Sequence, residues 1–269
     1  MDIKEITIHG GIGKNGEKEA LNTVTLKMGE IISIVGPTGS GKTALINDIE
    51  LFANQNTPSK RKILINGAIA PAEFVNDPSK NPIALITQHT NFLSDLPVHR
   101  FLTIHAKIRQ AGNGNSEAIV KETLDFANQL TGEPINQHCA MTELSGGQTR
   151  SLLIADAVII GNSPIILLDE IENAGIHRTK AIELLKQYKK IFIFVTHDPR
   201  IALLSDFRIS MKNGSMQKII ITDHEEKQAA EEIKKLDDLL LEFRTVIRAG
   251  GNITLKGLQE RLRSFGYVV

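Results

Sequence analysis

Short apolar runs, separated by polar or glycine-rich segments, recur along most of the chain. Three of them are continuous and of strand length: Ile31–Val35, Ile165–Leu168 and Ile191–Val195. Runs of this kind predict strands that are covered on both faces. Two further runs, Ile3–His9 and Val24–Met28, are joined by a glycine-rich segment and also read as strands. We expect the remaining strands at Ile63–Ile65 and Ile83–Thr87.

Segments with helical character lie between these predicted strands. They cover about residues 43–52, 96–130, 144–157 and 179–187, and a loop at residues 112–115 interrupts the second of them. Strands that alternate with helices predict a mainly parallel sheet with helices on its faces. Residues 3–28 and 63–65 are expected to add an antiparallel edge to this α/β core.

The pattern changes from Thr222 onward. The residues Thr222-Asp223-His224-Glu225 can form a capping box, and apolar residues then recur at spacings of three and four up to Ile247. This spacing predicts one helix of about 25 residues, which Gly250-Gly251 ends. A second short helix follows and stops at Gly266. We therefore expect two domains, at residues 1–218 and 219–269.

The long C-terminal helix carries an apolar stripe formed by Ile233, Leu236, Leu240, Phe243 and Ile247. Charged residues occupy its other faces, so those faces are expected to be solvated. A stripe with this spacing buries itself against another helix or a core. Two alternatives follow: the stripe joins two copies of the chain, or it packs on the core of its own chain.

Composition narrows the range of partners. The chain has 269 residues, 41% of them hydrophobic, and its 31 basic residues balance its 31 acidic ones. Without a basic excess no global field gathers nucleic acid or an anionic membrane, so no nucleic-acid partner is expected, although a local basic patch stays open. The N-terminus has no apolar signal core, and no apolar run approaches the roughly 20 residues of a membrane span. We expect a cytoplasmic chain that reaches the inner face of a membrane only through a partner.

The segment Gly36-Pro37-Thr38-Gly39-Ser40-Gly41-Lys42-Thr43 matches the phosphate-loop pattern G-x-x-x-x-G-K-[ST] in full. It lies between a predicted strand and a predicted helix, as that motif requires. The glycines let backbone N–H groups surround a β-phosphate, and the helix N-terminus adds a positive end. Lys42 is expected to reach the β- and γ-phosphate oxygens, and the Thr43 hydroxyl is expected to coordinate Mg²⁺. The expected ligands are therefore ATP and Mg²⁺.

Two carboxylates follow the buried run at residues 165–168. Asp169 is expected to belong to the Mg²⁺ shell, and Glu170 is expected to polarise a water in line with the γ-phosphate. Buried strands often end in an acid, so this pair indicates a nucleotide site only because a complete phosphate loop accompanies it.

A third motif, Leu144-Ser145-Gly146-Gly147-Gln148, resembles the signature L-S-G-G-Q of the ATP-binding cassette (ABC) family. A serine hydroxyl, exposed glycine N–H groups and a helix start all favour an anion. The resemblance implies that this signature in one copy covers the γ-phosphate held by the phosphate loop of another. It also implies a catalytic and Mg²⁺-sensing role for Gln88, and a hydrogen bond from His197 to the γ-phosphate.

The chain departs from the family pattern in three places. The family usually has an aromatic residue near the end of the first strand to stack on adenine, but residues 7–13 contain none. His9 is the nearest planar ring; it either stacks on the base or is an ordinary polar residue at a strand end. The D-loop, commonly Ser-Ala-Leu-Asp, reads Asn173-Ala174-Gly175-Ile176, and the arginine usual three residues past the signature is Ser151, with Arg150 one position earlier.

A second glycine pattern, Gly11–Gly16, matches G-x-G-x-x-G after a predicted strand. The next predicted strand begins near Val24, too soon for the crossover helix that a dinucleotide site requires. We therefore expect a hairpin loop at this pattern.

The resemblance covers about residues 1–218 and implies a P-loop NTPase of the ABC type, with a helical subdomain at about residues 89–158 and an α-helical C-terminal extension. The implied reaction is hydrolysis of ATP to ADP and phosphate with Mg²⁺, by a homodimer that closes on two ATP molecules. Two uses stay open: energising a membrane permease as a transporter subunit, or remodelling or activating a soluble client protein. For the second, residues 88–109 and the D-loop at residues 173–176 resemble, more weakly, the ATPase that helps activate methyl-coenzyme M reductase. A DNA-repair cassette is disfavoured because no long coiled-coil arm interrupts the domain.

Overall fold

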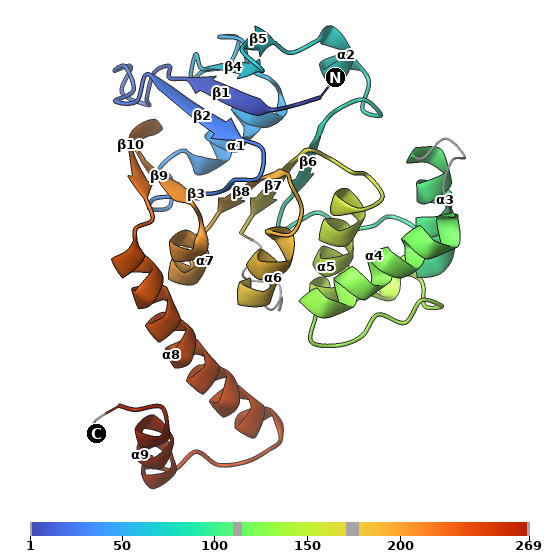
Figure 1. Ribbon diagram of the computed structural model, residues 1–269, viewed down its shortest axis with the longest axis vertical. Coiled ribbons are helices and arrows are strands. Elements are labelled where there is room, and N and C mark those ends of the chain that lie inside the picture. The colour runs from blue at the N-terminus through green and yellow to red at the C-terminus, as the bar shows by residue number, and fades with distance from the viewer. Residues whose placement is uncertain (1, 110–114, 171–177, 268–269) are drawn as a thin grey trace. The chain divides into compact units, whose positions relative to one another are not determined.

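The computed structural model describes residues 2–109, 115–170 and 178–267 (Figure 1). The chain divides into two compact units, residues 1–221 and residues 222–269. The first unit contains all of the strands among the described residues, and the second consists of two helices. Within the described part of the chain, no helix combines the length and the apolarity needed to cross a membrane.

The first unit is built on a six-stranded sheet in the order β10-β9-β3-β8-β7-β6. Its strands are β3 (Ile31–Val35), β6 (Ile83–Ile86), β7 (Ile165–Asp169), β8 (Ile191–Val195), β9 (Phe207–Lys212) and β10 (Ser215–Ile221). The five strands from β9 to β6 are parallel, which confirms the expected sheet. Strand β10 adds an antiparallel edge through a hairpin that the apolar pattern did not predict. The turn Asn213-Gly214 is the signal that could have revealed this hairpin.

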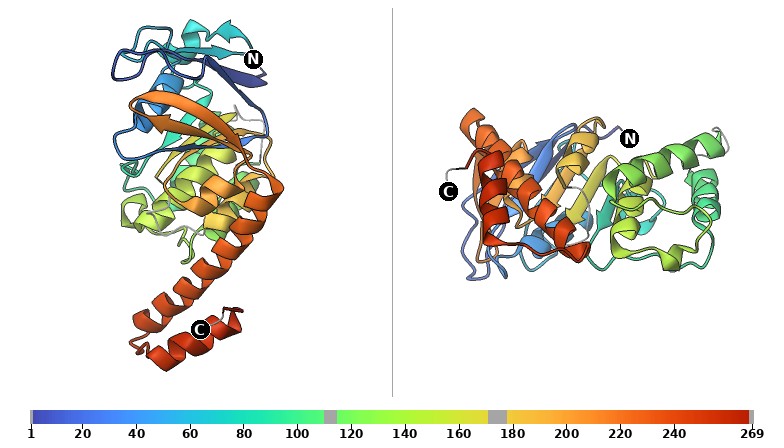
Figure 2. Two further views of the ribbon diagram at one scale, coloured as in Figure 1. Left: turned by 90° about the vertical axis from the view of Figure 1, so that its left-hand side faces the viewer. Right: turned by 90° about the horizontal axis from the view of Figure 1, so that it is seen from below.

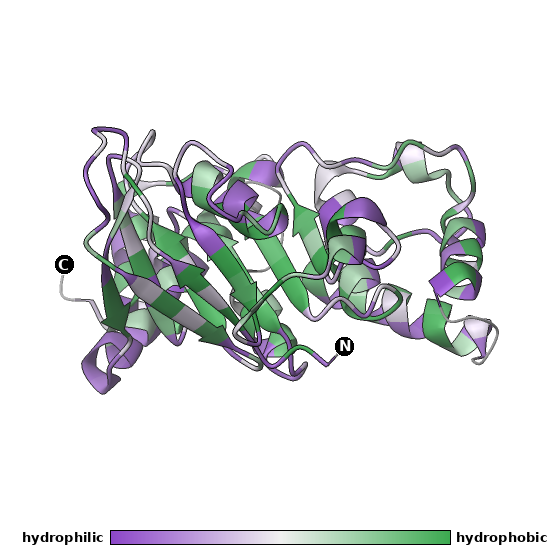
Figure 3. Cartoon of the chain, turned by 90° about the horizontal axis from the view of Figure 1, so that it is seen from above, coloured by the Kyte–Doolittle hydropathy of each residue, from purple (hydrophilic) through white to green (hydrophobic). Residues whose placement is uncertain are grey.

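Both faces of the six-stranded sheet are covered by a hydrophobic core. Because side chains alternate along each strand, β3, β6, β7 and β8 contribute to both cores. On one face Ile166, Leu168 and Phe194 belong to a core shared with α5 (Gly146–Val158), α6 (Arg178–Leu185) and α7 (Pro199–Leu204). On the other face Leu167 and Ile193 belong to a second core, which includes α1 (Lys42–Glu50). Figure 2 shows the three helices gathered on one side of the sheet. Figure 3 shows the hydrophobic colouring that runs along its strands.

The N-terminal strands form a separate antiparallel sheet. Its order is β2-β1-β4-β5, with β1 at Glu5–His9, β2 at Thr23–Lys27, β4 at Lys62–Ile65 and β5 at Ala68–Ile69. The antiparallel pairing was expected, and so was the hairpin loop between β1 and β2. The expectation that these strands extend the main sheet is wrong. Helix α1 supplies Leu45 and Ile49 to a core shared by both sheets, and therefore lies between them and keeps their backbones apart (Figure 1).

Helices α3 (Val98–Arg109), α4 (Ser116–Leu130) and α5 pack on one another in the region expected to be a helical subdomain. The side chain of Asn115 caps α4 by accepting hydrogen bonds from Glu117 N and Ala118 N. The expected loop at residues 112–115 lies, except for Asn115, outside the described residues. Two short helices complete the unit, α2 (Ala72–Asn76) and the 3₁₀ helix η1 (Met141–Glu143).

The second unit contains α8 (His224–Arg248), which has 25 residues, and α9 (Leu255–Ser264). The predicted long helix is therefore confirmed, but Asp223 rather than Thr222 caps it by accepting from Glu226 N. An ion pair between Arg261 and Glu242 joins the two helices.

The predicted stripe on α8 is partly exposed, and its members Ile233 and Phe243 are half-buried. Its members Leu236, Leu240 and Ile247 keep 44%, 53% and 60% of their surface exposed. The buried residues of this helix, Ala230 and Leu239, lie outside the stripe. Burial of the stripe, either between two copies or on the core of the same chain, stays a prediction.

Candidate nucleotide-binding site

Three neighbouring strands bring the predicted site residues to one edge of the main sheet. The strands β3, β8 and β7 are parallel, and their pairing places Ile34 and Asp169 each opposite Val195. The residues that follow these strands therefore leave the sheet at the same edge. In open α/β sheets this carboxyl edge is where ligands bind. Gly36, Glu170 and His197 thus come together although they are far apart in the sequence.

The phosphate loop follows β3 and packs tightly against the turn between β9 and β10. Gly41 has a φ of 98°, and a Cβ atom at this position would lie 2.7 Å from Gly214 Cα. Gly36 has a φ of 153°, and a Cβ atom there would lie 2.4 Å from Met211 O. Both positions therefore require glycine on steric grounds. The loop leads into α1, whose first turn (residues 42–45) carries no acidic side chain to neutralise the positive helix end.

Lys42 and Ser40 equip this loop for an anion. The Lys42 ammonium donates to Gly36 O at 2.9 Å and to Pro37 O at 3.2 Å, so it lies over the loop that it follows. Ser40 Oγ is buried and has no hydrogen-bond partner among the described residues. Buried hydroxyl groups without partners are rare, and one inside a phosphate loop fits an oxygen-rich ligand. The loop therefore fits the phosphate chain of ATP.

The two carboxylates after β7 lie beside the loop after β8. Glu170 N donates to Val195 O at 3.0 Å, and Glu170 adopts a φ of 49°. A non-glycine residue in this left-handed region costs on the order of 1 kcal/mol and is most common at functional sites. His197 Nε2 lies 3.7 Å from Glu170 Oε1. At this separation the carboxylate and the imidazole can both orient a single water molecule that lies between them and a phosphate.

The loop that carries His197 is held by hydrogen bonds of the residues before and after it. Thr196 Oγ1 accepts from Asp198 N at 2.9 Å, and the Asp198 side chain caps α7 by accepting from Arg200 N at 2.8 Å. Thr196 and Asp198 are buried, whereas His197 is exposed. The backbone is therefore fixed while the imidazole faces outward.

The donors expected for Mg²⁺ are the hydroxyl of Thr43, the carboxylate of Asp169 and the amide of Gln88. All are oxygen ligands, which Mg²⁺ prefers, and Thr43 and Asp169 lie at the carboxyl edge. Among the described residues no three His, Cys, Asp or Glu side chains are grouped to hold a metal. This donor set fits Mg²⁺ held jointly with phosphate oxygens rather than in an all-protein cage.

Arg150 links the signature helix to the segment after β6. Its guanidinium donates from Nη1 to Gly146 O at 2.9 Å and from Nη2 to the carbonyl oxygen of Gln88. Ser151, which occupies the position where the family has arginine, is fully buried. Arg150 lies one residue earlier on α5, where its side chain is only partly buried and reaches Gln88. The shifted arginine therefore makes a contact between the helical subdomain and the core. Only the arginine one place early in the sequence hinted at it.

The signature residues form the exposed start of α5. Ser145 is the N-cap, and its capping box is closed by Gln148 Oε1, which accepts from Ser145 N at 3.0 Å. Gln148 Nε2 also donates to Pro134 O at 3.1 Å. Ser145 and Gly146 are exposed. The positive end of this helix is therefore open to an anion presented from outside.

The three remaining positions differ in outcome. His9 Nδ1 lies 3.1 Å from Thr23 Oγ1, the contact of a polar residue at a strand end, and stacking on adenine stays a prediction. The segment Asn173–Ile176 lies outside the described residues. Lys14 was missed: its ammonium donates to Gly39 O at 2.7 Å and so touches the phosphate loop. It belongs to the hairpin loop, at a position that the Gly11–Gly16 pattern leaves unspecified, so the pattern gave no signal for it.

A family profile described as "ABC transporter" matches residues 22–173, which is more than half of the chain. The chain is 52% identical over 254 residues to an uncharacterised ABC transporter ATP-binding protein of Methanocaldococcus jannaschii. That alignment covers 94% of this chain and 96% of the relative.

Other relatives are more distant. The chain is 33% identical to a spermidine/putrescine import ATP-binding protein of Bacteroides fragilis over 81% of its own length, but it spans only 47% of that protein. Among solved structures, an ATP-binding cassette dimer bound to ADP and phosphate superposes with a TM-score of 0.60 at 23% identity. This superposition covers 81% of this chain and 99% of that one, and it shows a shared fold.

Proposed function

This chain belongs to the ABC transporter family of ATPases, and from that premise we propose that it is the energising nucleotide-binding subunit of a transporter. The observation that carries the proposal is the convergence of the phosphate loop, Glu170 and His197 at the carboxyl ends of β3, β7 and β8. The similarity to proteins named ABC transporter ATP-binding protein and spermidine/putrescine import ATP-binding protein supports the transporter assignment.

The residues divide the work of ATP hydrolysis. The loop from Gly36 to Thr43 holds the phosphates, and Lys42 neutralises charge on the β- and γ-oxygens. Thr43, Asp169 and Gln88 would hold Mg²⁺, which would supply further neutralisation of phosphate charge. Glu170 accepts a hydrogen bond from the attacking water and aligns it, while His197 donates to the γ-phosphate. These groups position and neutralise, and phosphoryl transfer demands little else from a protein.

Two copies close on two ATP molecules. The support is the exposed start of α5, where Ser145 and Gly146 face outward with the positive end of the helix. An exposed helix N-terminus binds an anion brought by another surface. In the closed dimer the signature residues Ser145–Gln148 of one copy cover the γ-phosphate in the other, which makes the interface two-fold symmetric.

ATP hydrolysis by two variants tests the assigned roles. Lys42→Ala is expected to weaken ATP binding by at least about tenfold, because a ground-state phosphate contact is lost. Glu170→Gln is expected to keep ATP affinity and to lose at least about 100-fold in turnover, because it acts on the attacking water. Glu183→Gln, an exposed change on α6, is the matched control. A Glu170→Gln protein with normal turnover would remove that residue from the mechanism.

The transporter role has its own test. The tagged chain, isolated from detergent-solubilised membranes of its native cell, is expected to bring down a protein with several apolar membrane spans. Recovery with a soluble protein in place of such a permease would contradict the transporter assignment and favour the activator alternative. Both outcomes are independent of the hydrolysis measurements above.

A further inference from the structure

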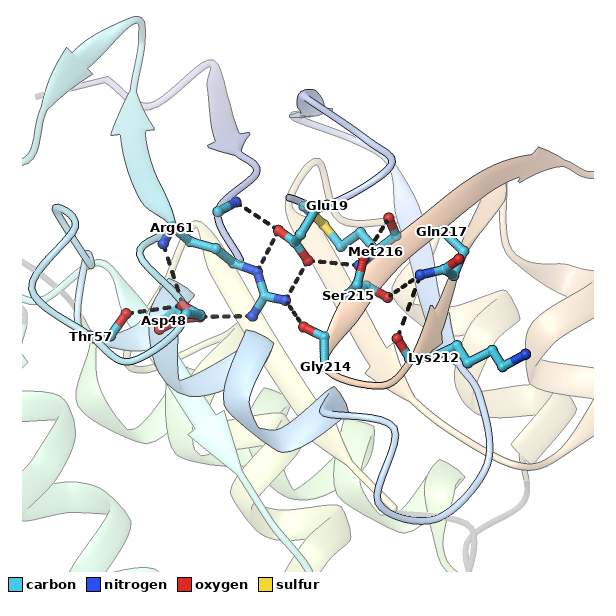
Figure 4. A network of polar contacts seen from close by, with 11 residues as sticks. Glu19, Asp48, Thr57, Arg61, Lys212, Gly214, Ser215, Met216 and Gln217 are labelled. Carbon is cyan, nitrogen blue, oxygen red and sulfur yellow. Dashed lines mark hydrogen bonds and ion pairs between the residues drawn. The ribbon is translucent and has the colours of Figure 1, made fainter. Parts of the chain in front are cut away.

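A cluster of buried charges lies beside the phosphate loop and takes no part in the proposed chemistry (Figure 4). Arg61 Nη2 lies 2.6 Å from Glu19 Oε1, and both side chains are fully buried. Arg61 Nη1 lies 2.8 Å from Asp48 Oδ2, whose side chain is 4% exposed. Burial lowers the pKa of the Arg61 guanidinium, but its hydrogen bonds and ion pairs with Glu19 and Asp48 outweigh that effect and raise the pKa. The guanidinium therefore stays charged.

The cluster joins four segments that are distant in the sequence. Glu19 belongs to the loop between β1 and β2, and Asp48 belongs to α1. Arg61 is the residue immediately before β4. Arg61 Nη2 also donates to Gly214 O, in the turn between β9 and β10, at 2.7 Å. Glu19 accepts from Met216 N at 2.7 Å on the same hairpin. Both sheets and the phosphate-loop helix thus meet at one guanidinium.

The segments that the cluster joins hold the phosphate loop from outside. Gly214 N donates to Ser40 O at 2.8 Å, while Gly214 O accepts from Arg61. Gly214 is therefore fixed between the guanidinium and the loop. On the other side Lys14 donates from its ammonium to Gly39 O and from its backbone N–H to Asn213 O, at 2.7 and 2.8 Å.

Stability alone is a weak reason for such a cluster. Buried ion pairs lose hydration that their attraction repays only in part, so apolar residues of similar volume often stabilise a fold as well. A guanidinium differs from an apolar side chain in its directed hydrogen bonds, which fix the positions of several groups at once. That property matters where a backbone must hold one conformation.

We propose that Arg61, with Glu19 and Asp48, is a positioning residue of the nucleotide site. It holds Gly214 against Ser40 and thereby keeps the phosphate loop in its phosphate-binding conformation before the nucleotide arrives. The inference rests on the proposed function, because it takes Gly36–Thr43 as the ATP site. Its effect falls on nucleotide affinity and not on turnover by the loaded site.

The test compares Arg61→Lys with the full-length native chain. Lysine keeps the positive charge but cannot reach Glu19, Asp48 and Gly214 O together. The Kd for Mg-ADP is expected to rise at least about tenfold, since a small misplacement of binding groups has effects of that size. The turnover number per occupied site is expected to stay within about twofold. Hydrogen exchange in peptides that contain residues 36–43 and 211–216 is expected to quicken.

Three further variants make the result decisive. Asp48→Asn removes a single partner of Arg61, so it serves if Arg61→Lys fails to fold. Asp156→Asn, which breaks the pair with His105 in the helical subdomain (2.7 Å), is the control for general destabilisation. Lys42→Ala reports on the ATP site itself.

Each outcome decides between the proposals. An unchanged Kd in the cluster variants, with a weakened Kd in Lys42→Ala, overturns the positioning role and leaves the proposed function standing. An equal rise in Kd for Asp156→Asn reduces the cluster to ordinary structure. An unchanged Kd in Lys42→Ala refutes the ATP site on which both proposals rest.

Discussion

Lys190, the residue before β8, is a buried cation outside the nucleotide site. It is 6% exposed, and its ammonium donates to Asn162 Oδ1 at 2.7 Å. Burial lowers the pKa of this ammonium to about 8 from its ordinary 10.5. Between these two values the unfolded chain binds more protons than the folded chain. The free energy of unfolding therefore rises with pH through this window and is flat with respect to Lys190 below and above it.

We predict that Lys190→Met removes this pH dependence and raises the free energy of unfolding at pH 7 by on the order of 1 kcal/mol, a gain limited by the lost hydrogen bond to Asn162. Urea unfolding of both proteins between pH 7 and 10 measures it. Lys189→Met, an exposed change next to it, is the control. Parallel stability curves for the native chain and Lys190→Met would show that Lys190 titrates normally.

We expect the site to discriminate only weakly between adenine and guanine nucleotides. Residues 7–13 contain no Phe, Tyr or Trp, so adenine lacks a stacking contact worth roughly 1 kcal/mol. Competition of GTP against ATP is expected to give affinities within about tenfold. His9→Ala tests the one planar ring in that segment. A preference for ATP beyond about a hundredfold would show that another pocket recognises the base.

At the scale of elements, the C-terminal helices are separable from the nucleotide site. Every predicted site residue lies in residues 1–221, which form their own compact unit. We predict that a chain ending at Ile221 keeps its ATP affinity within about threefold, because no phosphate contact is removed. Isothermal titration with the full-length chain alongside measures this. A large loss of affinity would mean that the helices order the site.

The exposed stripe of α8 leads to a different expectation for the same truncation. Leu236, Leu240 and Ile247 would leave water if two copies paired along this helix. We predict that light scattering without nucleotide finds a dimer for the full chain and a monomer for the chain ending at Ile221. A monomeric full-length protein would contradict the pairing.

At the scale of the whole molecule, ATP is expected to drive closure of two copies. The Glu170→Gln variant is expected to bind ATP without hydrolysing it. In a chain truncated after Ile221, which lacks the stripe, this variant should therefore form a dimer with ATP and Mg²⁺ but not with ADP. Gly146→Asp in the same background is the control. Its carboxylate suits the first turn of α5 but repels a phosphate from the facing copy. Light scattering that shows equal dimer with and without Gly146→Asp would place the interface elsewhere.

Local signals in the sequence determined the strands β3 and β8, the 25-residue helix α8 and the motifs of the nucleotide site. Each depends on residues close together in the chain, where spacing alone specifies a strand, a turn or a helix start. Parallel order then followed from alternation of strands and helices, and with it the common edge for Asp169 and His197.

Tertiary structure decided the features that depend on residues meeting across the fold. The N-terminal strands form their own sheet because α1 packs between the sheets, which apolar spacing cannot foresee. Arg61 and Glu19 are 42 positions apart, and Arg150 and Gln88 are 62 apart. From the sequence alone a charged residue is predicted to be solvated, because burying a charge is unfavourable unless an oppositely charged partner is buried beside it. Only packing brings that partner, so the buried cluster and its hold on the phosphate loop belong to the folded chain.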